Sequence, residues 1–340
     1  MPHPLDTSDF RRMILESPLQ FEVGFTLAEG VRVPGVFTSI MISGMGGSAL
    51  PGNLFRIYLN DLFRTDEPMN QPLSIYQNRS YALPPESFHE CLNFICSYSG
   101  NTEETVASFE EALQKGLPCI ALSAGGKIEE MAKAHGIPHI KLPIPFENFQ
   151  PRVGTGYFFG AMLQVLINQG LVPDERAMII KEAAELGVNM EKLEVIAQTL
   201  AERLVGKTPV IYTTAKYKSV AMVWKIKFNE NAKTPAFWNF FPELNHNEMV
   251  GWTLPQGQFC VIMLSDRDAH PQIEKRLRIT AELLQKKGVD VEILDMGGGS
   301  VYSRVFTSIA LGDLTSYHLA LLYGQDPTPV HMVEELKKML

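Results

Sequence analysis

Three hydroxyl side chains that lie within six positions of one another are the residues best suited to binding an anion. Ser97, Ser99 and Thr102 occur in SYSGNTEET (97–105), directly after an apolar run and directly before a helical pattern. The first turn of a helix presents unpaired N–H groups and a partial positive charge, and hydroxyl groups add further donors. A simple helix cap would account for Thr102, but not for the two serines and the glycine beside it. The segment therefore predicts a phosphate site.

A glycine-rich turn lies upstream, in GMGGSA (44–49), between a strand-like run and a helical pattern. Its letters fit the GxGxxA fingerprint of dinucleotide-binding folds, but that fingerprint needs an acidic residue at the end of the second strand to bind a ribose. The second strand here ends in YQN (76–78), so NAD is disfavoured and we expect no cofactor. A tight turn alone would need glycine. Beside the hydroxyl segment, we expect instead a backbone that approaches the phosphate closely, at Gly46, Gly47 and Ser48.

A carboxylate and an imidazole lie 16 residues apart in a segment that is rich in aromatic residues. Glu230 ends a helical pattern that begins near Lys218, and His246 follows within PELNHNE (242–248). A solvated loop would not hold the four aromatic residues between them, so we expect this segment to be ordered over a pocket. Either residue alone would be interpreted as an ordinary surface or core residue. Together they are the usual pair for moving protons on carbon and oxygen near neutral pH.

Other charged residues limit the chemistry further. Arg152 begins the helical region between the two halves of the chain, where a guanidinium could stabilise an oxyanion, although a lone arginine is more often part of an ion pair. In the second half, the turn that corresponds to the hydroxyl segment contains Asp266 and Asp268, which would repel a phosphate. We therefore expect one phosphate site per chain. His135 and His139 share no helix face, because a glycine and a proline intervene, and no metal site is predicted.

Strand-like runs alternate with helical patterns in both halves of the chain. In the first half we expect strands at 36–43, 73–77, 92–97 and 118–122, and helices at 49–63, 102–115 and 127–134. Residues 138–155 indicate an ordered loop and 156–204 helices; strands at 209–213, 259–264 and 289–294 and a helix at 271–287 follow. Apolar strands that alternate with helices predict parallel sheets covered on both faces. The repeated order favours two similar domains, at 1–152 and, with connecting helices, at 153–340.

Length and composition exclude several classes of protein. The 340 residues suffice for two domains, and the net charge of −8 disfavours binding to nucleic acid or to an anionic membrane. The four cysteines show no CxxC spacing, and three lie in apolar runs, which indicates buried thiols in a reducing compartment. No signal peptide and no membrane span is expected. These features predict a soluble, cytoplasmic protein.

Four segments in the same order resemble the bifunctional phosphoglucose/phosphomannose isomerases, a family of the sugar isomerase (SIS) superfamily. They are GMGGSALPGN, CSYSGNTEET, the segment around Arg152, and FNENAKTPAFWNFFPELNHNEMVGW. The resemblance extends from about residue 20 to the C-terminus. SYSGNTEET is typical of SIS domains in general, whereas Glu230 with PELNHNE is more specific to the isomerase branch. The resemblance implies two SIS domains, each a flavodoxin-like α/β/α sandwich with a parallel sheet, and hexose 6-phosphates as substrates.

The resemblance also implies a role for each candidate residue. Glu230 would move the proton when glucose 6-phosphate or mannose 6-phosphate is interconverted with fructose 6-phosphate through a cis-enediol(ate), without a metal. His246 would open the sugar ring, assisted by Lys337 or alternatively by Lys338, and Arg152 would stabilise the enediolate. The phosphate-binding residues would be Gly46, Gly47, Ser48, Ser97, Ser99 and Thr102. The family is dimeric, so a homodimer is implied in which His246 is supplied across the interface.

Alternative functions stay open at this point. A non-catalytic SIS sensor of sugar phosphates would keep SYSGNTEET but would not need Glu230, His246 and Arg152. An SIS isomerase of pentose or heptose phosphates is disfavoured by the two-domain length. The family's threonine linked to mannose acceptance has its nearest counterpart here in Thr328, and the sequence does not predict which hexose is preferred.

Overall fold

The computed structural model describes residues 3–63 and 73–339 and forms two compact units. Residues Glu16–Gly187 form what we call the N-terminal unit, and Met1–Leu15 together with Val188–Leu340 form the C-terminal unit. The start of the chain belongs to the C-terminal unit because α1 (Phe10–Leu15) packs on α11 (Val301–Leu322). This division does not coincide with the expected domain boundary after residue 152, since the helix that follows packs within the N-terminal unit.

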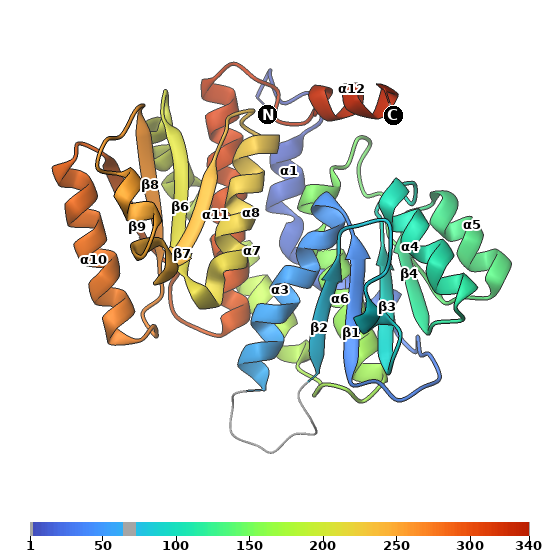
Figure 1. Cartoon of the computed structure of the whole chain (residues 1–340). Coiled ribbons are helices and arrows are strands. Elements are labelled where there is room, and N and C mark those ends of the chain that lie inside the picture. Colours follow the sequence, from blue (N-terminus) through green and yellow to red (C-terminus); the bar gives the residue numbers. More distant parts are fainter. Residues whose placement is uncertain (1–2, 64–72, 340) are drawn as a thin grey trace. The chain divides into compact units, whose positions relative to one another are not determined.

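The N-terminal unit contains a five-stranded parallel sheet (Figure 1). Its strands are β1 (Ser39–Gly44), β2 (Ser74–Asn78), β3 (Cys91–Cys96), β4 (Cys119–Ser123) and β5 (His139–Lys141). Its helices are α2 (Gln20–Leu27), α3 (Gly46–Leu62), α4 (Glu103–Gln114), α5 (Gly126–His135) and α6 (Thr155–Asn168), and α7 (Arg176–Leu204) continues into the other unit. The order β2-β1-β3-β4-β5 confirms the expected flavodoxin-like arrangement.

Right-handed crossovers place the helices of this unit on both faces of the sheet. α3 packs with α6 on one face, and α4 packs with α5 on the other. Strands β1, β3 and β4 are buried at every position, as their continuous apolar runs predict. β5 lies within the segment that was expected to be a loop. Its three residues pair with β4, and only one of them is buried. Such a short segment shows no strand pattern in the sequence, so the pairing was not predicted.

The C-terminal unit repeats this arrangement with four parallel strands in the order β7-β6-β8-β9. The strands are β6 (Thr208–Thr214), β7 (Phe237–Phe241), β8 (Phe259–Ser265) and β9 (Asp290–Asp295). The helices are α8 (Lys218–Glu230), α9 (Glu248–Gly251), α10 (Pro271–Lys286), α11 and α12 (His331–Met339). In both sheets the first strand lies between the second and the third. The similarity that the sequence predicted between the two halves is therefore present in the topology.

Strand β7 differs from the sequence-based expectation, which placed an ordered loop there. The segment FWNFF pairs with β6 along its whole length, from Val210 opposite Phe237 to Thr214 opposite Phe241. Aromatic residues favour strands, but the flanking Pro and Asn residues conceal this short run. The four aromatic residues are thus explained by a strand as well as by a covered pocket.

Two features of the core bear on localisation and redox chemistry. Helix α11 is long and apolar enough to cross a membrane, but 72% of its most apolar window is buried in the protein, as in the core helix of a soluble protein. All four cysteines are free and buried, as predicted. Burial raises the pKa of the Cys119 thiol to about 11 and that of Cys260 to about 12, which keeps both protonated and unreactive at neutral pH.

The crossing of α2 and α6 in the N-terminal unit depends on two glycines. A Cβ atom on Gly24 of α2 would lie 2.6 Å from the carbonyl oxygen of Tyr157, and one on Gly160 of α6 would lie 2.4 Å from that of Phe21. Both obstacles are backbone atoms, so a rotamer change cannot relieve them. This contact fixes α6, and with it the start of α6 that follows Arg152.

We predict that Gly160→Ala lowers the free energy of unfolding by roughly 1–3 kcal/mol, because the added methyl group forces the two backbones apart. Gly187→Ala on α7 is the matched control, since its Cβ would meet only the Cβ of Pro18, at 3.9 Å. That change is expected to raise the free energy of unfolding by about 0.5–1 kcal/mol through helix propensity. Urea unfolding followed by far-UV circular dichroism measures both. Equal effects would show that the α2–α6 contact is not close.

Candidate functional site

The two predicted phosphate-binding turns lie side by side at one edge of the first sheet. β1 ends at Gly44 and β3 ends at Cys96, and these two residues are paired in register. A Cβ on Gly44 would lie 2.6 Å from the Cys96 carbonyl oxygen, so only glycine allows this approach. Successive strands are added on one side of β1 and then on the other, so the strand order reverses between β1 and β3. Ligands of open α/β sheets bind at such a point, outside the carboxyl ends of the strands.

A direct hydrogen bond joins the two turns. The backbone N–H of Tyr98 donates to Ser48 Oγ at 2.9 Å, and Ser48 is buried. Gly46, with φ of +49°, begins α3. The N-termini of α3 and α4 therefore lie at the carboxyl ends of two neighbouring strands, where their N–H groups favour an anion. We call Gly46–Ser48 together with Ser97–Thr102 the anion cradle.

Ser97 organises the cradle from inside. Its side chain is fully buried, and its Oγ lies 2.9 Å from Thr102 Oγ1 and accepts the N–H of Gly100 at 3.1 Å. Thr102 is the N-cap residue of α4, but its hydroxyl makes no capping bond to the helix. A helix cap therefore does not explain this threonine. Ser99 is exposed, and its Oγ accepts only a long bond from the Asn101 N–H, at 3.3 Å.

A glycine holds the tip of the cradle against the next turn of the sheet. Gly100 has φ of +71°, and a Cβ there would lie 1.7 Å from the carbonyl oxygen of Gly125. The carbonyl oxygen of Gly100 accepts the N–H of Ile128 at 3.0 Å, which anchors the tip to α5. Glycine is therefore required at position 100 by the close approach of the Gly125 backbone, which the sequence did not predict.

Arg152 lies beside the cradle in the same unit. A Cβ on Gly47 would lie 2.8 Å from Arg152 Cα, so the start of α3 packs directly on the arginine backbone. Arg152 is 2% exposed, and its guanidinium donates from Nη1 to Gln150 Oε1 at 2.7 Å. A buried cation whose backbone packs on the start of α3 adds to the attraction of that helix N-terminus for an anion. The structure thus brings together Arg152 and the six predicted phosphate-binding residues.

The equivalent position of the second sheet is filled by protein side chains. Asp266 follows β8 and accepts a hydrogen bond from Arg304 Nη1 at 2.9 Å, and Asp268 pairs with the same guanidinium. The two carboxylates that were predicted to repel a phosphate here are paired with an arginine that the sequence did not predict. Arg304, on α11, satisfies both carboxylates of this turn.

Glu230 is the last residue of α8, and buried polar contacts fix this end of the helix. Lys227 Nζ forms an ion pair with Asp313 of α11 at 2.8 Å, and Asn231 Nδ2 donates to Ser316 Oγ at 3.0 Å. Lys233 Nζ donates to the carbonyl oxygen of Glu230 at 2.5 Å. The helix end is thus held on both sides of Glu230, whose side chain is half-buried. The lysine at 227 is a residue that sequence reasoning missed.

His246 lies beyond the other end of β7. It is exposed and follows a short turn (Glu243–Asn245), in which Asn245 Nδ2 donates to Thr280 Oγ1 at 3.0 Å. The chain passes from Glu230 into the start of β7 and reaches His246 after its end, and five strand residues span about 13 Å. The two residues of the predicted acid–base pair therefore do not meet within one C-terminal unit.

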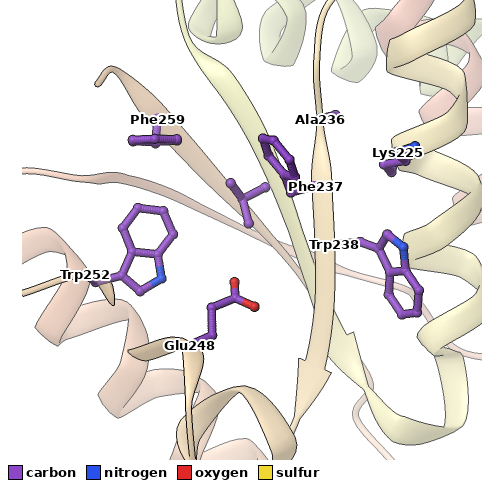
Figure 2. A pocket seen from close by; sticks show the side chains of 8 residues that line it. Lys225, Ala236, Phe237, Trp238, Glu248, Trp252 and Phe259 are labelled. Atoms are coloured by element: carbon purple, nitrogen blue, oxygen red, sulfur yellow. The ribbon is translucent and has the colours of Figure 1, made fainter. Parts of the chain in front are cut away.

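The aromatic segment does border a hollow, of about 440 Å³. It is lined by Val210, Lys225, Ala236, Phe237, Trp238, Glu248, Trp252 and Phe259. Figure 2 shows that Phe237 and Trp238 project to opposite sides of β7, with Trp252 and Glu248 on the side of Phe237. Glu248 is held by the hydroxyl of Tyr212 and the amide of Asn239. Neither Glu230 nor His246 lines this hollow.

Other predicted residues are not brought to the cradle unit. Lys337 and Lys338 lie on α12, whose described residues are all exposed, in the C-terminal unit. Thr328 is buried just before that helix. Asn78, where a dinucleotide-binding fold would place its ribose carboxylate, is buried and donates to Ser108 Oγ at 3.0 Å. Among residues 3–63 and 73–339, no three His, Cys, Asp or Glu side chains lie close enough to hold a metal.

Replacing two serines of the cradle should separate the internal role from the exposed one. Ser97→Ala removes the buried hydroxyl that bonds Thr102 Oγ1, while the Gly100 N–H keeps the Ser97 carbonyl oxygen as an acceptor. We predict that it lowers the free energy of unfolding by about 0.5–1.5 kcal/mol, as expected for one lost hydrogen bond. Ser99→Ala, at an exposed position, is expected to change it by less than about 0.5 kcal/mol. Urea unfolding measures both. A stability loss at Ser99 equal to that at Ser97 would contradict these assignments.

The chain is similar to several known proteins. A family model described as "Bacterial phospho-glucose isomerase C-terminal SIS domain" matches residues 194–340. Two proteins named bifunctional phosphoglucose/phosphomannose isomerase are similar over most of their length. The one from Caldicellulosiruptor bescii is 35% identical over 94% of each chain, and the one from Aquifex aeolicus is 34% identical over 89% of this chain and 91% of its own.

A protein with a different name and a solved structure are also similar to this chain. A protein from Sulfolobus acidocaldarius named D-glucosamine-6-phosphate 4-epimerase is 31% identical over 68% of this chain and 71% of its own. The crystal structure of a putative phosphosugar isomerase from Clostridium difficile superposes with a TM-score of 0.71 at 15% identity, covering 94% of this chain and 95% of its own, which shows the shared fold. With its identity to full-length relatives, its two parallel sheets and its anion cradle, the chain belongs to the family of bifunctional phosphoglucose/phosphomannose isomerases.

Proposed function

We propose that this protein is an aldose–ketose isomerase that interconverts glucose 6-phosphate or mannose 6-phosphate with fructose 6-phosphate. The observation on which the proposal depends is the anion cradle, where two helix N-termini, the Ser97–Thr102 hydroxyl pair and the buried Arg152 converge at the carboxyl edge of one sheet. This set suits a phosphate monoester. The names of the full-length relatives support a hexose phosphate as the substrate.

The proposed reaction requires only proton transfers. His246, with Lys337, moves a proton from the O1 hydroxyl to O5, so that the C1–O5 bond breaks and the C1 aldehyde forms. The Glu230 carboxylate then takes the proton from C2 while O1 gains one, which gives a cis-enediol. Loss of the O2 proton and return of the proton from Glu230 to C1 yield the ketose. Arg152 stabilises the enediolate charge. No metal or cofactor is needed to balance these steps.

One base serves both aldoses in this scheme. Glucose 6-phosphate and mannose 6-phosphate differ only in configuration at C2, so rotation about C2–C3 presents either C2 proton to the same carboxylate. Phosphate binding at the cradle orients the chain from a point remote from the reacting carbons. The pinned end of α8 keeps the position of Glu230 constant for both substrates.

The strand direction in the second sheet supports a homodimer. Glu230 and His246 lie beyond opposite ends of β7, and this separation supports a site in which one of the two residues comes from a second copy. We propose that His246 is supplied across the interface. We also propose that residues up to about 152 bind the phosphate, that the remainder of the chain supplies the proton transfer, and that the protein is cytoplasmic.

A coupled assay on both aldoses, with a chelator present, tests the reaction. We predict turnover of mannose 6-phosphate and glucose 6-phosphate by the unaltered protein, and a loss in kcat of about 10²–10⁴-fold for Glu230→Gln because the general base is removed. Sugar-phosphate binding by Glu230→Gln, measured by calorimetry, should persist. Binding without turnover by the unaltered protein would instead favour a non-catalytic sensor.

Mixing two inactive variants tests the shared site. In mixed dimers of Glu230→Gln and His246→Ala, one site contains both substitutions and the other contains neither. Random exchange makes half of the dimers mixed, so about a quarter of the normal activity should return. Each variant alone is the control. If both residues acted within one chain, mixing would restore no activity.

A further inference from the structure

Strand β7 is an edge strand that is rich in aromatic residues. It is the end strand of its sheet within the described residues, and its sequence, FWNFF, contains four aromatic residues and neither charge nor proline. Phe237 is 57% exposed, and Trp238, Asn239 and Phe240 are half-buried. Edge strands of soluble proteins normally carry charges, prolines or a cover, because a bare apolar edge pairs with other chains. Although the Phe240 N–H donates to Asn239 Oδ1 and Lys218 Nζ lies 5.3 Å from the Phe240 ring centroid, the exposed aromatic side chains make this edge suited to pairing with another chain.

We propose that β7 pairs antiparallel with β7 of a second copy, about a two-fold axis at Asn239. This inference rests on the proposed function and specifies its interface. The sequence is a near-palindrome about Asn239, and this centre alone uses all five strand residues. Phe237 then faces Phe241 of the partner subunit, and Trp238 faces Phe240 of the partner subunit. Such a contact is isologous, as closed dimers require, and aromatic cross-strand pairs are favourable.

The antiparallel direction solves the separation of the acid–base pair. The end of the partner's β7 comes beside the start of β7 in the first copy, which is the end at which Glu230 lies. The partner's His246 is therefore delivered to the same end of the sheet as Glu230. A parallel pairing would leave the two residues at opposite ends. The antiparallel direction therefore favours a second copy of this chain at the β7 edge over a strand of another protein.

The hollow beside β7 accommodates the partner's chain. Phe237 and Ala236, at the start of β7, border it together with Trp252, Glu248 and Phe259, on the face of the sheet that α10 covers (Figure 2). In the antiparallel pairing, the segment that leaves the partner's β7 passes this point on the same face. The apolar lining suits a proline-containing turn, and the carboxylate of Glu248 offers an acceptor to backbone N–H groups. We assign the hollow to the turn that precedes the partner's His246.

Disulfide trapping tests the geometry independently of activity. Directly opposite residues of an antiparallel pair have Cα atoms about 4.5–5.5 Å apart, within the range of a disulfide. Asn239→Cys should therefore give a covalent dimer under mild oxidation, seen on non-reducing gels. The native thiols are buried and do not compete. Leu283→Cys, exposed on α10, is the control and should not cross-link. A dimer in solution that fails to cross-link at position 239 would overturn the proposed pairing.

A charge at the edge provides a second test. Phe237→Glu alters an exposed side chain, so the subunit should still fold, as circular dichroism will show. We expect sedimentation to report monomers and kcat to fall about 100-fold or more, since the partner's His246 is lost. Leu283→Glu should change neither. A dimeric, active Phe237→Glu protein would overturn the pairing. Restored activity on mixing Glu230→Gln with His246→Ala would still support the proposed function, which separates the two hypotheses.

Discussion

The direction of parallel strands is the constraint on which the arrangement of functional residues depends. In a parallel sheet the chain enters and leaves each strand at opposite ends, so residues close in sequence on either side of a strand are separated by its length. The constraint gathers the turns after β1 and β3 at one edge, where Ser48 accepts the Tyr98 N–H. The same constraint separates Glu230 from His246, because β7 lies between them. One rule of backbone geometry thus assembles the anion cradle within a single unit and separates the two residues proposed as the acid–base pair.

The anion cradle suits a phosphate in an acidic protein because it uses dipoles and buried groups rather than surface charge. The chain has a net charge of −8, yet two helix N-termini, internal hydroxyl groups and the 2%-exposed Arg152 meet at one point. Glycine makes this possible, since Cβ atoms at Gly44, Gly47 or Gly100 would lie 1.7–2.8 Å from neighbouring backbone. Low local dielectric strengthens each of these interactions relative to water. Binding of this kind is selective for a small anion and does not attract polyanions to the surface.

The sequence predicted the parts of the molecule that local patterns encode. Continuous apolar runs predicted the buried strands β1, β3 and β4, and the hydroxyl segment predicted the cradle that the structure assembles. The short strands β5 and β7 were missed, because three or five residues carry too little periodicity and owe their state to pairing with β4 and β6. Long-range partners such as Asp313 for Lys227, or Arg304 for Asp266, were also missed, since no local pattern relates residues 38 or more positions apart.

The two units share a topology but differ in the residues at the carboxyl ends of their central strands. In the N-terminal unit the edge between β1 and β3 keeps hydroxyls and glycines, and it remains suited to an external anion. In the C-terminal unit the equivalent edge between β6 and β8 contains two carboxylates satisfied by Arg304 of the same unit. The ion pair there satisfies both carboxylates within the unit. In the proposed reaction the C-terminal unit contributes other features instead, the end of α8 to proton transfer and the edge of β7 to pairing with a second copy. Two units of the same fold have two equivalent sites at the carboxyl ends of their strands, and only one of these sites needs to bind the substrate.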